Sequence, residues 1–295
     1  MYSALKFIRT LKISRLSAFS TFQKEFCSSS SEDVVVVTKL KKLHLIGINR
    51  PEKRNAINTE TSKQLIKAFE LFEEDNDAYA AVLYGKGGNF CSGYDLNEVA
   101  EGKSLSELSA ETGPMGPTRM LLKKPVVAAV NGYAVGGGFE MALWCDLRVI
   151  DETAVMGFFN RRFGVPLIDG GTVRLPQMIG LPRALDLILT GRSINAKEAF
   201  ELGLATKITA CGTAIGNALN LANSLCKFPQ ECLRADRLSA YNSAYNSDSL
   251  KEALASEYQN SKHVLELESV KGAEKFVQGV GRHGTFHIDA KEDFV

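Results

Sequence analysis

The most constraining feature of this sequence is the run KKPVVAAVNGYAVGGGFEMALWCDLRVI, residues 123–150. Its apolar segment 126–130 is typical of a buried strand, the glycine-rich turn that follows predicts a helix from about Gly138, and residues 147–150 resume a strand. Strands and helices that alternate over such short links are typical of helices packed on a largely parallel sheet. The run therefore predicts an α/β layered fold.

Segments on either side extend this pattern. Residues 34–50 are predicted as two short strands around a lysine-rich turn. Thr59 is the expected N-cap of an amphipathic helix that ends in the acidic cluster 73–77, and the apolar residues 80–84 are typical of a strand covered on both faces. From residue 195 onward the composition predicts helices with almost no strand between them.

Charge and cysteine content narrow the classes of function. With 35 basic and 34 acidic residues among 295, the chain has a net charge of +1, so bulk electrostatic binding to nucleic acid or an anionic membrane is not expected. No apolar stretch reaches the roughly 18 to 20 residues of a membrane-spanning helix. The six cysteines form no C-x-x-C pair and no metal-like spacing with histidine, so we expect neither a disulfide framework nor a metal site.

The first 24 residues differ from the remainder of the chain. They are rich in serine and apolar residues, contain no acidic residue before Glu25, and carry the basic residues Lys6, Arg9, Lys12, Arg15 and Lys24. This composition is typical of a mitochondrial transit peptide, although a disordered tail of accidental basicity has the same appearance. We therefore expect residues 1–32 to be a transit peptide or disordered, and the chain to reside in the mitochondrial matrix.

Two glycine-rich turns are the strongest candidates for a site. Residues 92–95 (SGYD) and 135–140 (VGGGFE) place backbone N–H groups at or just before a helix start, where they lack intrahelical partners and suit an oxyanion or a phosphate. Glu140 follows Gly137 by about one helical turn, so its carboxylate can face the same ligand. A phosphate-binding P-loop is disfavoured because no lysine follows the glycines. A G-x-S-x-G motif is missing too, and the four histidines lie outside both turns.

Five segments together resemble the crotonase (enoyl-CoA hydratase/isomerase) superfamily over about residues 34–284. In chain order they are INRPEKRNAIN, FCSGYDLNEV, KKPVVAAVNGYAVGGGFEMALWCDLRV, FGVPLIDGGTVRLPQMIG and LTGRSINAKEAFELGLATKI. The resemblance implies an α/β spiral core of repeated ββα units over residues 33–190. It implies that residues 191–295 are a helical region that covers the site and supports assembly into a homotrimer or hexamer. The implied substrate is an acyl-CoA thioester, with no metal or redox cofactor.

The same resemblance implies roles for individual residues. The amides of Tyr94 and Gly137 match the oxyanion hole that holds the thioester oxygen, and Glu140 matches a catalytic acid/base. Without that role Glu140 is a solvated first-turn carboxylate that complements the helix dipole. Further substrate-binding positions implied by the match are Ser92, Gly93, Asp95, Gly136 and Asn160.

One departure from the family pattern bears on the reaction. Hydratases of this family carry a second glutamate where this chain has Asn160, and an amide cannot accept a proton. Asp169 is a candidate substitute beside Glu140; alternatively it caps the following turn or pairs with Arg161, Arg162 or Arg174. We therefore expect an enoyl-CoA hydratase-like lyase of mitochondrial fatty-acid or amino-acid breakdown. The alternatives are isomerisation, decarboxylation, thioester hydrolysis, or non-catalytic binding of acyl-CoA or RNA on the same fold.

Overall fold

The computed structural model describes residues 33–102 and 111–281, so the expected transit peptide lies outside the described residues. The larger of its two sheets has six strands in the order β1-β2-β3-β4-β6-β9, and every neighbouring pair except β1 and β2 is parallel. The strands are β1 (Val35–Leu40), β2 (Leu43–Ile48), β3 (Ala80–Gly85), β4 (Val126–Val130), β6 (Leu147–Asp151) and β9 (Lys207–Thr209).

The smaller sheet makes the chain a spiral. Its strands are β5 (Tyr133–Val135), β7 (Val155–Gly157) and β8 (Ser193–Asn195), in the order β5-β7-β8. β4 in the large sheet is followed by β5 in the small one, and β6 is followed in the same way by β7. A bridge between Cys91 and Ala134 adds the segment after β3 to the same series. Each turn of the spiral therefore contributes one segment to each layer.

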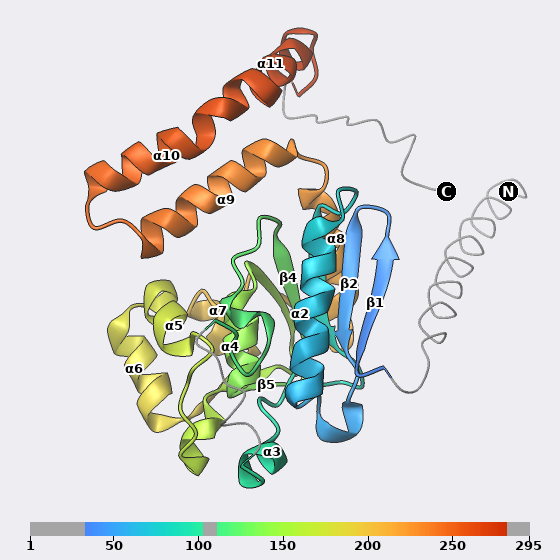
Figure 1. Cartoon of the computed structure of the whole chain (residues 1–295), viewed down its shortest axis with the longest axis vertical. Helices are drawn as coiled ribbons and strands as arrows, with labels where there is room; N and C mark the ends of the chain where they lie inside the picture. The colour runs from blue at the N-terminus through green and yellow to red at the C-terminus, as the bar shows by residue number, and fades with distance from the viewer. Residues whose placement is uncertain (1–32, 103–110, 282–295) are drawn as a thin grey trace, which may run out of the picture.

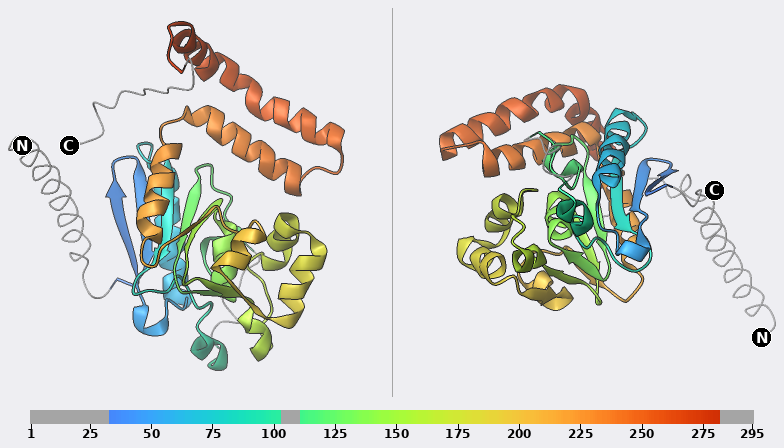
Figure 2. Two further views of the ribbon diagram at one scale, coloured as in Figure 1. Left: turned by 180° about the vertical axis from the view of Figure 1, so that it is seen from behind. Right: turned by 60° about the horizontal axis from the view of Figure 1, so that its bottom comes forward.

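Helices cover both faces of the large sheet (Figures 1 and 2). The α-helices of the core and its edge are α2 (Thr59–Glu74), α3 (Leu96–Ala100), α4 (Gly137–Trp144), α5 (Gly171–Ile179), α6 (Leu181–Thr190), α7 (Ala196–Glu201) and α8 (Ala214–Leu225). Those of the C-terminal region are α9 (Gln230–Tyr245), α10 (Leu250–Val264) and α11 (Val270–Val277), the last two joined by a π-helical turn, Leu265–Ser269. Short 3-10 turns are η1 (Pro51–Lys53), η3 (Pro117–Arg119) and η4 (Phe159–Phe163).

Alternation along the strands builds two apolar clusters. In β2, Leu43 and Leu45 belong to the cluster shared with α8, whereas Ile46 and Ile48 belong to the cluster shared with α2 and α4. This follows from the period of two in a strand, which sends successive side chains to opposite faces. Both faces of β2, β3 and β4 are buried, which confirms the strand predicted over residues 80–84.

One expectation about a helix start was wrong, and one short strand was missed. Asn58, not Thr59, caps α2: its side chain accepts a hydrogen bond from the amide of Thr61 at 3.0 Å. Both residue types are good N-caps, so the sequence alone does not choose between neighbours. β9 was also missed, because a strand of three residues is too short to carry a period.

Close packing at both ends fixes α4. A Cβ placed on Gly138 would lie 2.2 Å from the carbonyl oxygen of Cys91, so only glycine lets the helix start approach that segment. At the other end, the buried guanidinium of Arg148 donates to the carbonyl oxygens of Ala142 and Cys145. These bonds satisfy carbonyls that a helix end leaves without partners. The start of α4 is therefore held rigidly against the neighbouring turn.

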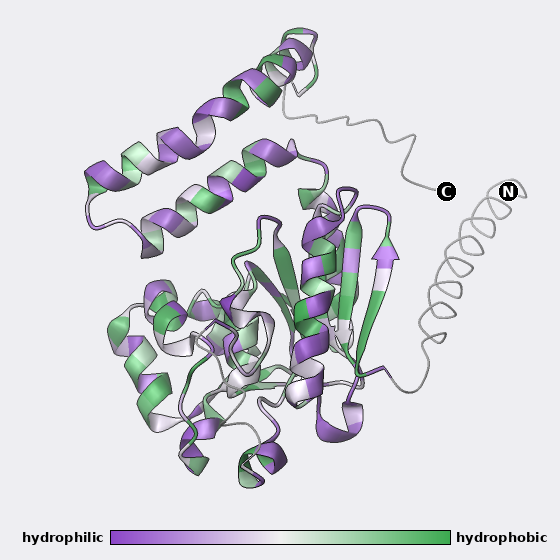
Figure 3. Cartoon of the chain, in the orientation of Figure 1, coloured by the Kyte–Doolittle hydropathy of each residue, from purple (hydrophilic) through white to green (hydrophobic). Residues whose placement is uncertain are grey.

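The C-terminal helices extend away from the spiral core (Figure 1). The core does not end at residue 190, because β9 completes the large sheet and α8 packs on its face. α9 is anchored by Asp146, which accepts hydrogen bonds from Arg237 at 2.8 Å and from Tyr241 at 2.9 Å. α10 carries mixed polar and apolar side chains (Figure 3), and none of the helices within the described ranges is long and apolar enough to cross a membrane.

Candidate active site

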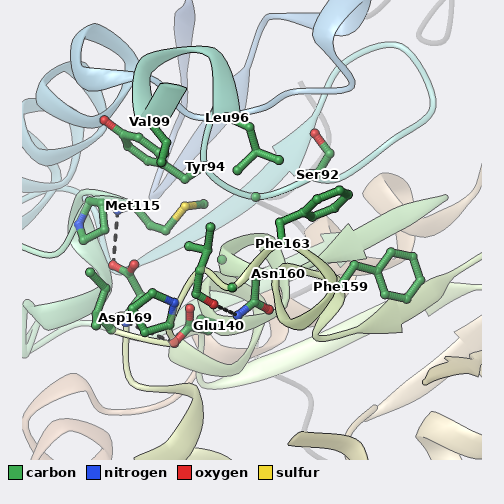
Figure 4. Close-up of a pocket in the computed structure, with 18 residues that line it drawn as sticks. Ser92, Tyr94, Leu96, Val99, Met115, Glu140, Phe159, Asn160, Phe163 and Asp169 are labelled. Carbon is green, nitrogen blue, oxygen red and sulfur yellow. Dashed lines mark hydrogen bonds between the residues drawn. The ribbon is translucent and has the colours of Figure 1, made fainter. Parts of the chain in front are cut away.

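A cavity of about 330 Å³ opens where the two glycine-rich turns meet (Figure 4). Eight of the nine residues expected at the site line it: Ser92, Gly93, Tyr94, Gly136, Gly137, Glu140, Asn160 and Asp169. The residues that line this cavity within the described ranges all lie between Ser92 and Asp169. The site is therefore assembled by the spiral core.

The amide of Tyr94 is aimed by its own peptide plane. The carbonyl oxygen of Gly93 accepts a hydrogen bond from the amide of Ile57 at 2.8 Å, and Asp95 donates to the carbonyl of Ile57 at the same distance. In a planar trans peptide the C=O and N–H groups point in opposite directions. The N–H of Tyr94 therefore points away from Ile57. Gly93, at φ 99°, makes the turn that allows this geometry.

The amide of Gly137 is aimed in the same way. The carbonyl oxygen of Gly136 accepts from the amides of Phe139 and Glu140 in the first turn of α4, so the N–H of Gly137 points out of the helix start. A Cβ placed on Gly93 would lie 3.3 Å from the amide nitrogen of Gly137, which shows how closely the two turns approach. One amide before α3 and one at the start of α4 thus border one cavity, an arrangement suited to a developing oxyanion.

Glu140 is buried, not a solvated first-turn carboxylate. Its side chain is 2% exposed, and Oε1 accepts hydrogen bonds from the amides of Asp169 at 3.0 Å and Gly171 at 2.8 Å. Burial, followed by the charge of Asp169, raises the pKa of Glu140 to about 7, although both amides act against this rise. A carboxyl with a pKa near neutrality can both accept and donate a proton under cellular conditions.

Asp169 lies beside Glu140 and is also buried, at 2% exposure (Figure 4). Its Oδ1 accepts hydrogen bonds from the hydroxyl of Thr118 at 2.5 Å and the amide of Met115 at 3.2 Å. Burial raises the pKa of Asp169 despite these bonds. Arg174 contacts its main-chain oxygen at 2.9 Å rather than its carboxylate. The charge of Asp169 therefore influences the protonation of Glu140.

Asn160 lines the same cavity, and only one of the two polar atoms of its side-chain amide has a hydrogen-bond partner among the described residues. Its Nδ2 donates to the carbonyl oxygen of Val165 at 2.7 Å, which fixes the orientation of the side chain. Its Oδ1 is buried and has no hydrogen-bond partner among the described residues. A buried acceptor without a partner is costly, so this oxygen is suited to a donor brought by a water molecule or a ligand.

Asp95 is the expected site residue that does not line the cavity. Its carboxylate accepts from Arg50 at 3.1 Å and from the amide of Asn97, and it caps α3. Asp95 and Glu98 have the spacing of a capping box, but Glu98 instead accepts hydrogen bonds from Thr59 and from the hydroxyl of Tyr94. In the structure Asp95 therefore caps α3 and pairs with Arg50 and does not face the cavity.

The remaining walls are mostly apolar and were not identified from the sequence. They comprise Leu96, Val99, Pro114, Met115, Phe159, Phe163, Val165, Pro166 and Ile168, together with Gly164. Thr118 and Met115 were missed as partners of Asp169 because they are 51 and 54 residues away in the chain. Within the described residues, no group of three His, Cys, Asp or Glu side chains is placed to hold a metal ion.

Comparison with known proteins gives one consistent family. A profile of the enoyl-CoA hydratase/isomerase family matches residues 39–281. The chain is 32% identical over 209 residues to a probable mitochondrial enoyl-CoA hydratase of Dictyostelium discoideum, which covers 71% of this chain and 73% of that protein. It is 38% identical over 188 residues to the enoyl-CoA hydratase EchA19 of Mycobacterium tuberculosis, covering 61% and 70%.

Solved structures agree with the sequence comparison. The enoyl-CoA hydratase EchA1 of Mycobacterium marinum matches with a TM-score of 0.79 at 30% identity, covering 84% of this chain and 96% of that one. An enoyl-CoA hydratase from Mycobacterium tuberculosis matches with a TM-score of 0.78 at 32% identity over the same shares. The expected α/β fold with a helical C-terminal region is confirmed.

Proposed function

Because this chain belongs to the enoyl-CoA hydratase/isomerase family of enzymes, we propose that it is a hydratase-like lyase acting on an acyl-CoA thioester. The observation that carries the proposal is the pair of amides at Tyr94 and Gly137, each opposed in its peptide to a carbonyl already bonded elsewhere. These amides hold the thioester oxygen. Donors of this kind contribute about 3 to 4 kcal/mol each when negative charge develops on that oxygen.

Proton transfer is assigned to Glu140 and Asp169. A water molecule bound between Glu140 and Oδ1 of Asn160 attacks C3 of a 2-enoyl thioester, and its proton passes to the Glu140 carboxylate. The electrons of the C2–C3 double bond move onto the thioester oxygen against the two amides. The proton held on Glu140 then passes to the Asp169 carboxylate, which delivers it to C2, so that both carboxylates return to their starting state. The raised pKa values of both carboxyls support this exchange near neutral pH.

An activity screen tests the reaction type. Purified enzyme is offered 2-enoyl-CoA, 3-enoyl-CoA and malonyl-type esters, and products are identified by mass spectrometry. Glu140→Gln and Asp169→Asn are each expected to lower kcat with 2-enoyl-CoA by about 10²-fold or more, because each removes a proton-transferring group. Asp151→Asn is the matched control, since Asp151 is a buried carboxyl, 1% exposed, outside the cavity lining.

Each alternative has its own outcome in this screen. Turnover of 3-enoyl-CoA alone indicates an isomerase, and release of CO2 or free CoA indicates a decarboxylase or a thioesterase. If no ester is converted while wild type and Glu140→Gln both bind CoA esters, the chain is a binding module. Unchanged turnover of every ester by Asp169→Asn removes Asp169 from the mechanism.

We also propose the cellular setting and the assembly. The acid-free basic segment 1–24, with the mitochondrial name of the Dictyostelium relative, supports a location in the mitochondrial matrix. Exposed Leu181, Leu185 and Leu189 on one face of α6 support a homotrimer or hexamer. No metal or redox cofactor enters the proposed steps. Fractionation of cells and light scattering of the purified enzyme test these two points.

A further inference from the structure

A single carboxylate oxygen connects three groups behind the cavity wall. Oε2 of Glu98, on α3, accepts hydrogen bonds from the amide and the hydroxyl of Thr59, each at 2.9 Å, and from the hydroxyl of Tyr94 at 2.8 Å. Burial opposes its charge, but the bonds from Thr59 and Tyr94 outweigh burial and lower the pKa of Glu98. The side chain is therefore an anion at neutral pH. Glu98 is not among the residues that line the cavity.

These bonds act on both sides of the isolated β-bridge between Ile57 and Tyr94, which orients the Tyr94 amide. On one side Thr59 follows Ile57 by two residues and begins α2, and on the other side Tyr94 itself is held through its hydroxyl. The bridge bonds of Ile57 fix the peptide plane between Gly93 and Tyr94, and that plane aims the Tyr94 amide. A shift between the two segments would tilt this plane. Glu98 is placed to prevent such a shift.

We infer that Glu98 is a positioning residue, which aligns the Tyr94 amide with the thioester oxygen by tying Tyr94 to the start of α2. The inference rests on the proposed function, because it matters only if that amide holds the substrate carbonyl. Glu98 itself exchanges no proton with the substrate. Its contribution is geometric, and misplacing a group at a reacting centre by about 1 Å can cost as much as 10²-fold in rate.

The inference predicts a selective loss. Glu98→Ala should lower kcat about tenfold, less than the 10²- to 10³-fold that follows removal of an oxyanion donor, because the amide stays in place but is poorly aligned. Glu98→Gln should stay within about threefold of wild type, since its amide oxygen still accepts from Thr59 and Tyr94. Tyr94→Phe added to Glu98→Ala should cause no further loss, because both changes break the same connection.

A comparison of two ligands separates alignment from folding. Butyryl-CoA carries a thioester carbonyl, whereas butyl-CoA, a thioether, has the same chain without that oxygen. Glu98→Ala should weaken binding of butyryl-CoA about tenfold and change binding of butyl-CoA less than twofold, as measured by calorimetry. The infrared carbonyl band of bound butyryl-CoA should lie at lower frequency than in water for wild type and should return toward the free value in the variant.

The matched control is Glu268→Ala. Like Glu98, Glu268 accepts hydrogen bonds at a helix start, here from the main-chain amides of Glu231 at 3.1 Å and Cys232 at 2.9 Å, but it lies in the C-terminal region. Glu268→Ala should reduce thermal stability without changing the ratio of the affinities for butyryl-CoA and butyl-CoA. If Glu98→Ala weakens both ligands equally, or neither, the positioning role is refuted. If wild type itself shows neither a preference for the thioester nor a band shift, the proposed function fails instead.

Discussion

Replacing Glu140 by Gln should make the folded chain more stable near and above neutral pH. Burial and the charge of Asp169 raise the pKa of Glu140 from its ordinary 4.5 to about 7. Between these pH values the folded chain holds a proton that the unfolded chain has released, so the free energy of unfolding falls as the pH rises. At about 1.4 kcal/mol per pH unit, the free energy of unfolding of the wild type falls by about 3 kcal/mol over this pH interval.

Gln removes this loss while keeping the shape of the side chain. Its amide oxygen can still accept from the amides of Asp169 and Gly171, which lie at 3.0 and 2.8 Å from the present Oε1. A neutral side chain does not ionise, so the variant lacks the fall in stability. The difference between variant and wild type should grow from about pH 4.5 and become constant above about pH 7.

Urea unfolding at a series of pH values measures this difference directly. The same variant should lose about 10²- to 10⁴-fold in kcat, because the acid/base group is gone, so stability and activity change in opposite directions. A difference in unfolding free energy that does not vary with pH would show that Glu140 titrates normally in the folded chain. The argument from burial would then be wrong.

Three further changes probe the fold and the site. Gly138→Ala should lower the free energy of unfolding by about 2 kcal/mol or more, measured in urea, because its Cβ would lie 2.2 Å from the Cys91 oxygen; an unchanged midpoint would refute the close contact. Arg148→Met should cost about 3 kcal/mol by leaving buried carbonyls unpaired, and a calorimetric unfolding temperature equal to wild type would contradict this. Asn160→Asp should move the pH midpoint of kcat/KM upward, because another negative charge disfavours ionisation of Glu140. A midpoint that stays in place would mean that position 160 does not influence Glu140.

The fold class could be predicted because its signals are local. The alternation that divides Leu45 and Ile46 between two clusters, and the glycines at the start of α4, are visible within a few residues of sequence. β9 could not be predicted, since three residues joining an existing sheet edge carry no pattern of their own. The end of the core at residue 190 was therefore misplaced.

The candidate site, too, could be predicted only where its signals are local in the sequence. Both glycine turns and Glu140 were identified because backbone conformation and spacing along one helix are encoded locally. The hydrogen-bond partners of the buried carboxylates were not identified, because those residues are far apart in the sequence and become neighbours only when the chain folds. Glu98 bonds across 39 residues to Thr59 instead of closing a capping box with its neighbour Asp95, and Asp169 is held from 51 residues away by Thr118.

The two amides at Tyr94 and Gly137 belong to the main chain, and this has a consequence for mutational scanning. A substitution at Tyr94 changes the side chain and leaves the N–H in place, so an alanine scan there reports the loss of the hydroxyl bond to Glu98 and not the contribution of the amide itself. A loss of similar size should appear at other positions that set the angle of the peptide, such as Gly93 and Glu98. A map of intolerant side chains would therefore include Glu140, Asp169 and the residues that orient the two amides, but it would not report the contribution of the amides themselves.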